Sequence, residues 1–259
     1  MVAPPHEGGY HPIFSVFQMI SFSDDIIIKE SKATTLTFVG ATIPKQNTCA
    51  SVLAHLKDRM RGEWDITVYK NIPLGAGLGG GSSNAGTLLR ALNQLEDMGL
   101  SQQDMVDIAA QIGSDVPFFI YGGQCGVSGY GEHVVPVQHM KVPYFILLLP
   151  NIHCSTPLVY SQLDVLNEFD NVDELNHVHQ TKLGFNRLQA AAFKVSPSLG
   201  QLYQVLLDLG AKAFLSGSGS TLFVPFKSKI NMDHAFVELS VALKNWDVVI
   251  KKARSINLD

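Results

Sequence analysis

Residues 73–84 read Pro-Leu-Gly-Ala-Gly-Leu-Gly-Gly-Gly-Ser-Ser-Asn, and a helical repeat of apolar residues follows them. Glycines let a backbone turn through positive φ and approach a ligand closely. A helix that begins directly after such a loop offers free N–H groups and the positive end of its dipole, which together attract phosphate. The stretch therefore predicts a cradle for the phosphates of a nucleotide.

Two other kinds of phosphate loop fit this stretch less well. A Walker A loop would need a lysine where Gly81 stands. The segment Gly75-x-Gly77-x-x-Gly80 matches a dinucleotide-binding fingerprint, but that fold requires a strand after the helix. Residues 100–112 read as a second helix instead. A purely structural turn stays open as an interpretation, although such a turn needs far fewer glycines.

Composition excludes several classes of protein. With 259 residues and 46% hydrophobic residues, the chain can bury the core of one large domain or two small ones. No stretch approaches the roughly 18 apolar residues of a membrane span. The net charge of −4 disfavours non-specific binding to nucleic acid.

The start of the chain and its cysteines suggest a compartment. Residues 1–7 lack the basic and apolar regions of a signal peptide. Cys49, Cys125 and Cys154 are scattered, which indicates a reducing environment without a zinc site. We interpret His177 and His179 as part of a surface loop rather than a metal pair. We therefore expect a cytoplasmic protein.

Hydrophobic periodicity predicts an α+β chain with mainly antiparallel pairing. In the first part we expect strands over residues 13–22, 25–30, 35–38, 64–69, 116–121, 124–128 and 134–138, and helices over 47–60, 83–95 and 101–113. Ser82 or Ser83 would cap the second of these helices. The character changes near residues 139–143. Beyond it we expect strands over 144–149, 213–215, 221–225 and 248–252, helices over 157–163, 185–195, 198–209 and 233–246, and a polar stretch over 167–181.

Several motifs, taken in order, resemble those of the GHMP kinases. Besides residues 73–84 they are Gly9-Tyr10-His11, Gly113-Ser114-Asp115-Val116-Pro117-Phe118-Phe119, Gly129-Tyr130-Gly131-Glu132, Phe185-Asn186 and Ser216-Gly217-Ser218-Gly219-Ser220-Thr221. The resemblance runs from residue 8 to about residue 226. It is strongest with the branch that phosphorylates 4-diphosphocytidyl-2-C-methyl-D-erythritol in the non-mevalonate isoprenoid pathway.

The resemblance implies a two-lobed α+β GHMP kinase fold. A ribosomal-protein-S5-like N-terminal lobe would span residues 1–140, and a ferredoxin-like C-terminal lobe would span residues 141–259. Ligands would bind in the cleft between the lobes, a common place for small-molecule sites.

The resemblance also implies roles for individual residues. Asp115 would be the catalytic group, accepting the proton of the substrate hydroxyl or holding that hydroxyl for attack; from the sequence alone, a turn residue is the alternative. ATP would bind at Lys70, Pro73, Leu74, Gly75, Ala76, Gly77, Leu78, Gly79, Gly80, Gly81, Ser82 and Ser83. Mg²⁺ would arrive with ATP, within possible reach of Ser83, and we expect no other metal.

The substrate would be bound by four aromatic residues, namely Tyr10, His11, Tyr130 and Tyr160. Of these, Tyr10, His11 and Tyr160 would meet its cytidyl end. An aromatic face suits stacking on a nucleobase, although the helical spacing around Tyr160 also fits simple core packing. Residues Ser216, Gly217, Ser218 and Gly219 would form a second loop that closes over the active site, and an ordinary turn between strands is the alternative.

Two departures from the family pattern affect this interpretation. The family usually begins with Ala-Lys-x-Asn-Leu-x-Leu, whose Lys lies beside the catalytic Asp, whereas the first lysine here is Lys29. Either the natural protein is longer, or the chain lacks part of the catalytic pair and is weak or inactive. In addition, Arg187 and Gln189 stand where the family has two carboxylates, and we expect both at the surface.

The preferred interpretation is an ATP-dependent kinase that acts on this small-molecule substrate as a monomer or homodimer, without nucleic-acid or membrane partners. A GHMP kinase for another small alcohol is the nearest alternative. A nucleotide-binding protein without catalysis is the alternative from a different class.

Overall fold

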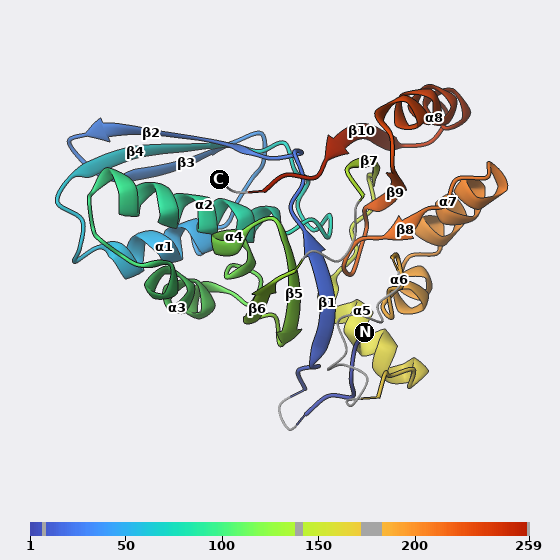
Figure 1. The fold of residues 1–259 in the computed structure, drawn as a ribbon, viewed down its shortest axis with the longest axis horizontal. Coiled ribbons are helices and arrows are strands. Elements are labelled where there is room, and N and C mark those ends of the chain that lie inside the picture. Colours follow the sequence, from blue (N-terminus) through green and yellow to red (C-terminus); the bar gives the residue numbers. More distant parts are fainter. Residues whose placement is uncertain (7–8, 138–141, 172–182, 258–259) are drawn as a thin grey trace.

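The computed structural model describes residues 1–6, 9–137, 142–171 and 183–257. In Figure 1 the sheet β2-β4-β3 and helices α1 to α3 lie on the left, and β7 to β10 with α5 to α8 lie on the right. The sheet β1-β5-β6 stands between these two groups. Among the described residues, no helix is long and apolar enough to cross a membrane.

The N-terminal group contains two three-stranded sheets, with strand orders β2-β4-β3 and β1-β5-β6. The strands β3 and β4 pair in parallel, and the other pairs of these sheets are antiparallel. Apolar faces of α1 and α2 pack with β4, with Leu88, Leu89 and Ile66 fully buried. The elements are β1 (Ile13–Gln18), β2 (Asp25–Ser31), β3 (Thr35–Val39), α1 (Thr48–Leu56), β4 (Glu63–Tyr69), α2 (Gly80–Leu95), α3 (Gln102–Ile112), α4 (Phe118–Tyr121), β5 (Gln124–Gly129) and β6 (His133–Pro136).

The C-terminal group has one four-stranded antiparallel sheet with strand order β10-β7-β9-β8. Along the chain, helices lie between β7 and β8 and again between β9 and β10, which is the order of elements in a ferredoxin-like fold. The elements are β7 (Tyr144–Pro150), α5 (Thr156–Leu166), α6 (Gln189–Val195), α7 (Pro197–Asp208), β8 (Phe214–Leu215), β9 (Leu222–Phe226), α8 (Lys229–Ala242) and β10 (Val248–Arg254).

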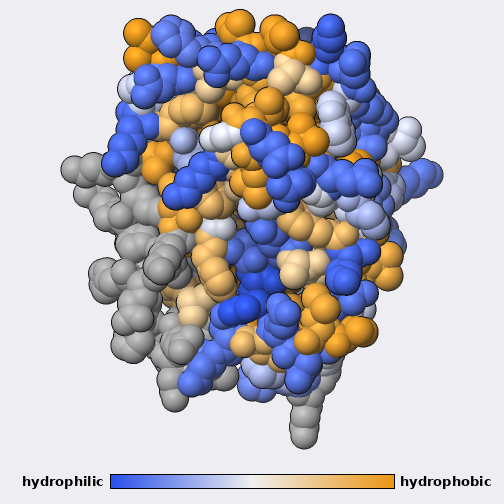
Figure 2. Space-filling model, turned by 90° about the vertical axis from the view of Figure 1, so that its right-hand side faces the viewer, coloured by the Kyte–Doolittle hydropathy of each residue, from blue (hydrophilic) through white to orange (hydrophobic). Residues whose placement is uncertain are grey.

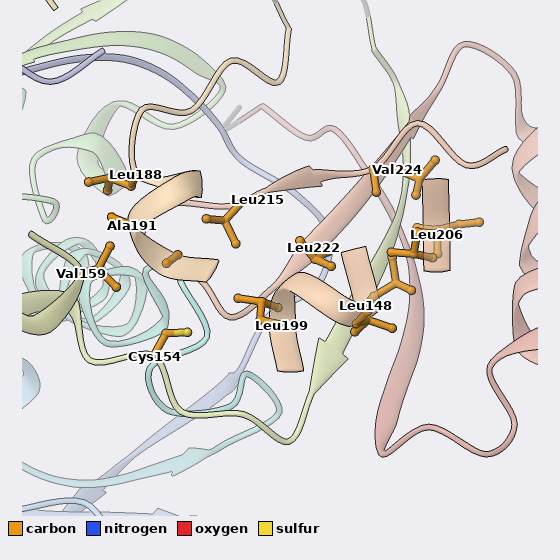
Figure 3. Close-up of a cluster of buried hydrophobic side chains, with 14 of the residues drawn as sticks. Leu148, Cys154, Val159, Leu188, Ala191, Leu199, Leu206, Leu215, Leu222 and Val224 are labelled. Atoms are coloured by element: carbon orange, nitrogen blue, oxygen red, sulfur yellow. The ribbon is translucent and has the colours of Figure 1, made fainter. Parts of the chain in front are cut away.

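The four-stranded sheet buries both of its faces. Alternate residues of a strand point to opposite faces. Leu148 therefore joins the core beneath the helices, where Figure 3 shows it with Leu199, Leu206 and Leu222. Leu147 on the opposite face packs in a cluster that includes Leu78. Leu78 belongs to the glycine-rich stretch that begins at Pro73 and leads into α2, which we call the glycine loop. The sheet thus supports the loop that the sequence singled out.

The surface of the C-terminal group is mixed. Figure 2, which turns the right-hand side of Figure 1 towards the viewer, shows hydrophobic groups separated by hydrophilic ones across its coloured residues. Exposed apolar side chains of α8, which lies at the right of Figure 1, are Ile230, Val237 and Val241.

Most expected elements are present, with four main corrections. Residues 116–121 were expected as a strand, but Phe118–Tyr121 form the short helix α4, because a short apolar run fits a buried helix as well as a strand. The strand expected over residues 13–22 ends at Gln18, and Ile20 forms only an isolated bridge with Ser255. The helix expected from residue 233 begins at Lys229, because the Ser228 side chain caps it.

The fourth correction concerns the helix after the glycine loop. It begins at Gly80, and its N-cap is Gly79 with a left-handed φ of 63° and no side-chain cap. Ser82 and Ser83 therefore do not cap the helix but lie within its first turn. The glycines carry the chain directly into the helix, which leaves both hydroxyls available for a ligand.

Candidate functional site

The glycine loop presents the start of α2. Gly75, Gly77 and Gly79 all have positive φ, which glycine adopts without strain. Ser83 N–H donates to the Gly79 carbonyl (2.8 Å), which closes the first helical turn. The N–H groups before it precede the first helical hydrogen bond and have no partner within the helix. The hydroxyls of Ser82 and Ser83 make no hydrogen bond with the described residues. These groups fit a phosphate.

The second glycine loop rests on the first. Thr221 N–H donates to the Ala76 carbonyl (3.1 Å), and Ser216 Oγ donates to the Gly77 carbonyl (2.8 Å). Asn186 Nδ2 donates to the carbonyls of Leu215 (3.0 Å) and Gly217 (2.8 Å). The structure therefore brings together two of the motifs expected at the active site. Asn186 links a third motif, Phe185-Asn186, to them.

Ser218 and Gly219 complete this second loop. The hydroxyls of Ser218 and Thr156 lie 2.8 Å apart, so the start of α5 contacts the loop. Gly219 has a positive φ of 93°. A Cβ added at Gly219 would lie 3.5 Å from Cys154 Sγ, which shows how closely the loop packs on the core.

Lys70 lies just before the glycine loop, where its side chain is almost completely buried. Its ammonium pairs with the carboxylate of Asp24. In this structure the ammonium group of Lys70 therefore forms an ion pair with Asp24. The expected contact of Lys70 with ATP stays a prediction.

Asp115 lies in the turn between α3 and α4. Its carboxylate accepts no hydrogen bond and pairs with no cation among the described residues. Burial raises the pKa of this carboxyl above its ordinary value of 3.8. A carboxyl that is partly removed from water and left without a partner is costly for folding, which is typical of a functional group.

The turn of Asp115 is packed against the glycine loop and against the motif around Tyr130. A Cβ added at Gly79 would lie 3.0 Å from the ring of Phe119, so α4 supports the start of α2. A Cβ added at Gly131 would lie 3.0 Å from the Ser114 carbonyl.

Tyr160 connects this turn to the C-terminal group. Burial, and to a smaller extent the negative charge of Asp115, raise the pKa of Tyr160 to about 12. The two residues therefore interact electrostatically although they come from different lobes. The phenol is neutral at physiological pH and can act as a hydrogen-bond donor.

The four aromatic residues expected to bind the substrate form two pairs. The ring of His11 lies 5.0 Å from that of Tyr160, and His11 also stacks on Phe169 at 5.9 Å. Tyr10 and Tyr130 meet edge to face at 6.2 Å, and both are exposed. Exposed aromatic rings beside a buried, hydrogen-bonded imidazole suit recognition of a nucleobase.

Three site residues escaped the sequence reasoning. Asp164 on α5 binds His11 Nε2 at 2.8 Å. Phe169 stacks on the same imidazole, and Asp24 holds Lys70. Each contact joins residues far apart in the chain, so no local spacing signals it.

Arg187 corrects the expectation that its position lies at the surface. Its guanidinium binds the buried carboxylate of Asp170, which also accepts from the N–H of Val2 at 2.8 Å. The side chain of Arg187 is only 27% exposed. Arg187 therefore links the segment before α6 to the first residues of the chain, which run alongside β1.

Metal-binding clusters and cavities are two other features that can mark a functional site. Within the described ranges, no group of three His, Cys, Asp or Glu side chains could hold a metal ion, and His177 and His179 lie outside those ranges. A hollow on the flank of the glycine loop is lined by Leu74, His153 and Lys251, but not by Asp115.

Comparisons with known proteins agree with this geometry. The family model for the GHMP kinases N terminal domain matches residues 47–123, and the model for the GHMP kinases C terminal domain matches residues 163–243. The 4-diphosphocytidyl-2-C-methyl-D-erythritol kinase of Syntrophotalea carbinolica is 35% identical over 236 residues, 85% of this chain and 82% of that one. The enzyme of the same name from Thermodesulfovibrio yellowstonii is 34% identical over 251 residues, covering 90% and 88%.

Solved structures give the same result. A crystal structure of 4-(cytidine 5'-diphospho)-2C-methyl-D-erythritol kinase matches with a TM-score of 0.78 and 27% identity over 100% of this chain and 95% of the other. A mevalonate kinase matches with a TM-score of 0.69 at 16% identity, which shows the shared fold. The two-lobed α+β fold expected from the sequence is confirmed, and the boundary after residue 140 stays a prediction. The chain belongs to the GHMP kinase superfamily and, within it, to the 4-diphosphocytidyl-2-C-methyl-D-erythritol kinase family.

Proposed function

We propose that this chain transfers the γ-phosphoryl group of ATP to the 2-hydroxyl of 4-diphosphocytidyl-2-C-methyl-D-erythritol. The relatives that carry this name support the substrate. The observation that carries the proposal is the partly buried carboxylate of Asp115, which has no partner among the described residues and whose charge acts on Tyr160 of the other lobe.

The phosphates of ATP would bind at the start of α2. The N–H groups of Gly80, Gly81 and Ser82 would donate to phosphate oxygens, and the positive end of the helix dipole would favour their charge. The hydroxyls of Ser82 and Ser83 would donate as well. Mg²⁺ would accompany ATP within reach of Ser83 and would neutralise charge that develops on the transferred group.

Asp115 would act on the alcohol. The hydroxyl oxygen would form a bond to the γ-phosphorus while the bond from that phosphorus to the β–γ bridging oxygen breaks, and ADP would leave. The proton of the hydroxyl would pass to the Asp115 carboxylate. The raised pKa of this carboxyl brings its basicity closer to neutral pH, which favours proton transfer.

The cytidyl group would bind at the aromatic pairs. His11 and Tyr160 would line one part of this subsite, and the exposed rings of Tyr10 and Tyr130 would cover another. The loop of residues 216–219 would close over the reacting groups. A cytoplasmic location and a monomeric or homodimeric state stay predictions. The absence of nucleic-acid partners is also a prediction, and the net charge of −4 supports it.

A second candidate function is nucleotide binding with little or no phosphoryl transfer, and one observation favours it. No lysine or arginine among the described residues pairs with Asp115. A chain without a cation at this carboxylate would bind nucleotide and transfer the phosphoryl group slowly or not at all.

Measurement of ADP release with MgATP, with and without the cytidyl alcohol, tests the proposal. We expect release that depends on the alcohol, a loss of about 100-fold or more in Asp115→Asn, and no loss in Asp107→Asn, an exposed carboxylate on α3. ATP binding without release would favour the second candidate. Release with mevalonate or homoserine and not with the cytidyl alcohol would assign the chain to another GHMP kinase activity.

A further inference from the structure

The carboxylate of Asp24 lies where the two ends of the glycine loop meet. Its side chain is fully buried. At the entrance to the loop it accepts the N–H groups of Asn71 (2.7 Å) and Ile72 (2.8 Å). Beyond the loop it accepts Asn84 Nδ2 (3.0 Å), from the second turn of α2. One side chain therefore fixes the chain both before Pro73 and after Ser83.

The charge of Asp24 is balanced within the same cluster. Lys70 pairs with it, and the lysine side chain is only 4% exposed. A buried carboxylate keeps its charge when a cation and hydrogen-bond donors surround it. Lys70 therefore neutralises Asp24, and the pair acts as one unit at the base of the loop.

A glycine-rich loop needs such an anchor more than other loops do. Glycine has more conformational freedom to lose on ordering than any other residue. Fixing both ends of the loop narrows the positions that its N–H groups and serine hydroxyls can sample. Asn84 is especially well placed, because it directly follows Ser83 in the chain.

We propose that Asp24 is a positioning residue for the phosphate cradle, which it holds in its binding geometry by tying residues 70–72 to Asn84. The inference rests on the proposed function only in that ATP is the ligand of the cradle. Asp24 acts through the backbone and through Asn84, and no contact with the nucleotide is part of the proposal.

The chain offers a matched control at the opposite end of the same helix. Glu96 follows α2, is 7% exposed, and accepts hydrogen bonds from the N–H groups of Arg61 (2.9 Å) and Gly62 (3.0 Å) and from the indole of Trp64. Glu96→Gln thus neutralises another largely buried carboxylate with several hydrogen bonds, at the end of the helix away from the loop. Asp24→Asn is the test variant. Asn84→Ala is a milder variant, because it removes only the hydrogen bond from Asn84 to Asp24.

Two measurements on the full chain decide the proposal without the alcohol substrate. The first is the Kd for MgATP, and the second is hydrogen–deuterium exchange of residues 74–83 in the ATP-free protein. In Asp24→Asn we expect the Kd to rise about 10-fold or more, and loop exchange to become faster by about 5-fold or more. Asn84→Ala should change both in the same direction by less. Glu96→Gln should leave both within about 2-fold.

Equal effects of Asp24→Asn and Glu96→Gln on loop exchange would overturn the proposal, as would unchanged loop exchange in Asp24→Asn. If Asp24→Asn does not fold, Asn84→Ala decides by the same comparison. Failure of the proposed function has a different signature, because a parent chain that binds MgATP but releases no ADP leaves both measurements intact. If the parent chain binds no ATP, loop exchange alone decides.

Discussion

Ser216 Oγ donates a hydrogen bond of 2.8 Å to the carbonyl oxygen of Gly77, across 139 positions of sequence. The contact joins the second glycine loop, in the C-terminal lobe, to the proposed phosphate cradle in the N-terminal lobe. A second bond, from Thr221 N–H to the Ala76 carbonyl, runs beside it. The cradle is therefore built by both lobes together.

Gly77→Ala tests this contact. The added Cβ would lie 2.4 Å from the Ser216 carbonyl oxygen and 2.7 Å from that of Gly219, at a φ of +70°. Because the neighbours are backbone atoms, the two loops must separate. We expect the Kd for MgATP to rise at least about 10-fold and the free energy of unfolding to fall by more than the roughly 1–2 kcal/mol of left-handed strain alone.

Gly99→Ala is the control for Gly77→Ala. Gly99 has a similar φ of +67°, but a Cβ there would meet nothing within 4 Å. This variant should lose only about 1–2 kcal/mol and keep its affinity for MgATP. Similar losses of affinity in the two variants would show that contact between the loops is unimportant for the cradle.

Asp115→Asn should raise the stability of the protein at neutral pH. Burial raises the pKa of Asp115, so the folded state holds the proton more tightly than the unfolded state does. The stability that this carboxyl contributes is therefore present below its ordinary pKa of 3.8 and is lost as pH rises through the raised value. Asp115→Asn has no carboxyl to titrate, so the variant does not lose this stability as pH rises.

Thermal unfolding across a pH series measures the effect. The difference between Asp115→Asn and the parent chain should be smallest below pH 3.8, grow as pH rises, and become constant above the raised pKa. A variant that is less stable than its parent at neutral pH would contradict the prediction and indicate an unrecognised structural role for the carboxylate.

Asp164→Ala should weaken binding of the alcohol substrate and leave ATP unaffected. Asp164 fixes the imidazole of His11, whose side chain is only 3% exposed, so removal of the acceptor frees the ring beside Tyr160. We expect KM for the cytidyl alcohol to rise about 10-fold, as for loss of a charge-assisted hydrogen bond. Asp208→Ala, which removes only an acceptor for Gln204 on α7, is the control and should change neither KM. A parallel rise in KM for ATP would count against a role confined to the cytidyl subsite.

Arg187→Met should destabilise the fold. Burial raises the pKa of Asp170, but hydrogen bonds from Arg187 and Val2, and the charge of Arg187, outweigh it and hold the pKa below 3.8. The ion pair therefore contributes stability above pH 3.8 that is lost as pH falls through the lowered value. We expect a loss of about 2–4 kcal/mol at neutral pH, measured by urea unfolding.

Lys229→Met provides the comparison for Arg187→Met. Lys229 pairs with Asp233 on the surface of α8, where its side chain is 69% exposed. Such an exposed pair contributes little to the free energy of unfolding, because solvent and salt screen it. Equal losses in the two variants would mean that the Arg187–Asp170 pair is no stronger than a surface pair.

Local sequence patterns determined much of this protein. The glycines before an amphipathic helix predicted the phosphate cradle. The helix expected over residues 101–113 is also present as α3, and Ser101 and Asp104 form a capping box at its start. The order of strands and helices predicted an α+β chain with mainly antiparallel pairing, and the resemblance to the GHMP kinases implied the ferredoxin-like C-terminal lobe. Glycine conformation, caps and periodicity act within a few residues, so they can be read along the chain.

Tertiary structure alone decided the contacts that complete the site. Nothing near Asp24 in the sequence indicates that its carboxylate meets Lys70 and Asn84, 46 and 60 positions away. Nor does the sequence place Ser216 on Gly77. Whether residues 116–121 became strand or helix was also decided by tertiary packing, since Phe119 of α4 lies against Gly86 of α2. These outcomes depend on which buried groups find partners when distant segments pack, and that free energy has no signature in a short window of sequence.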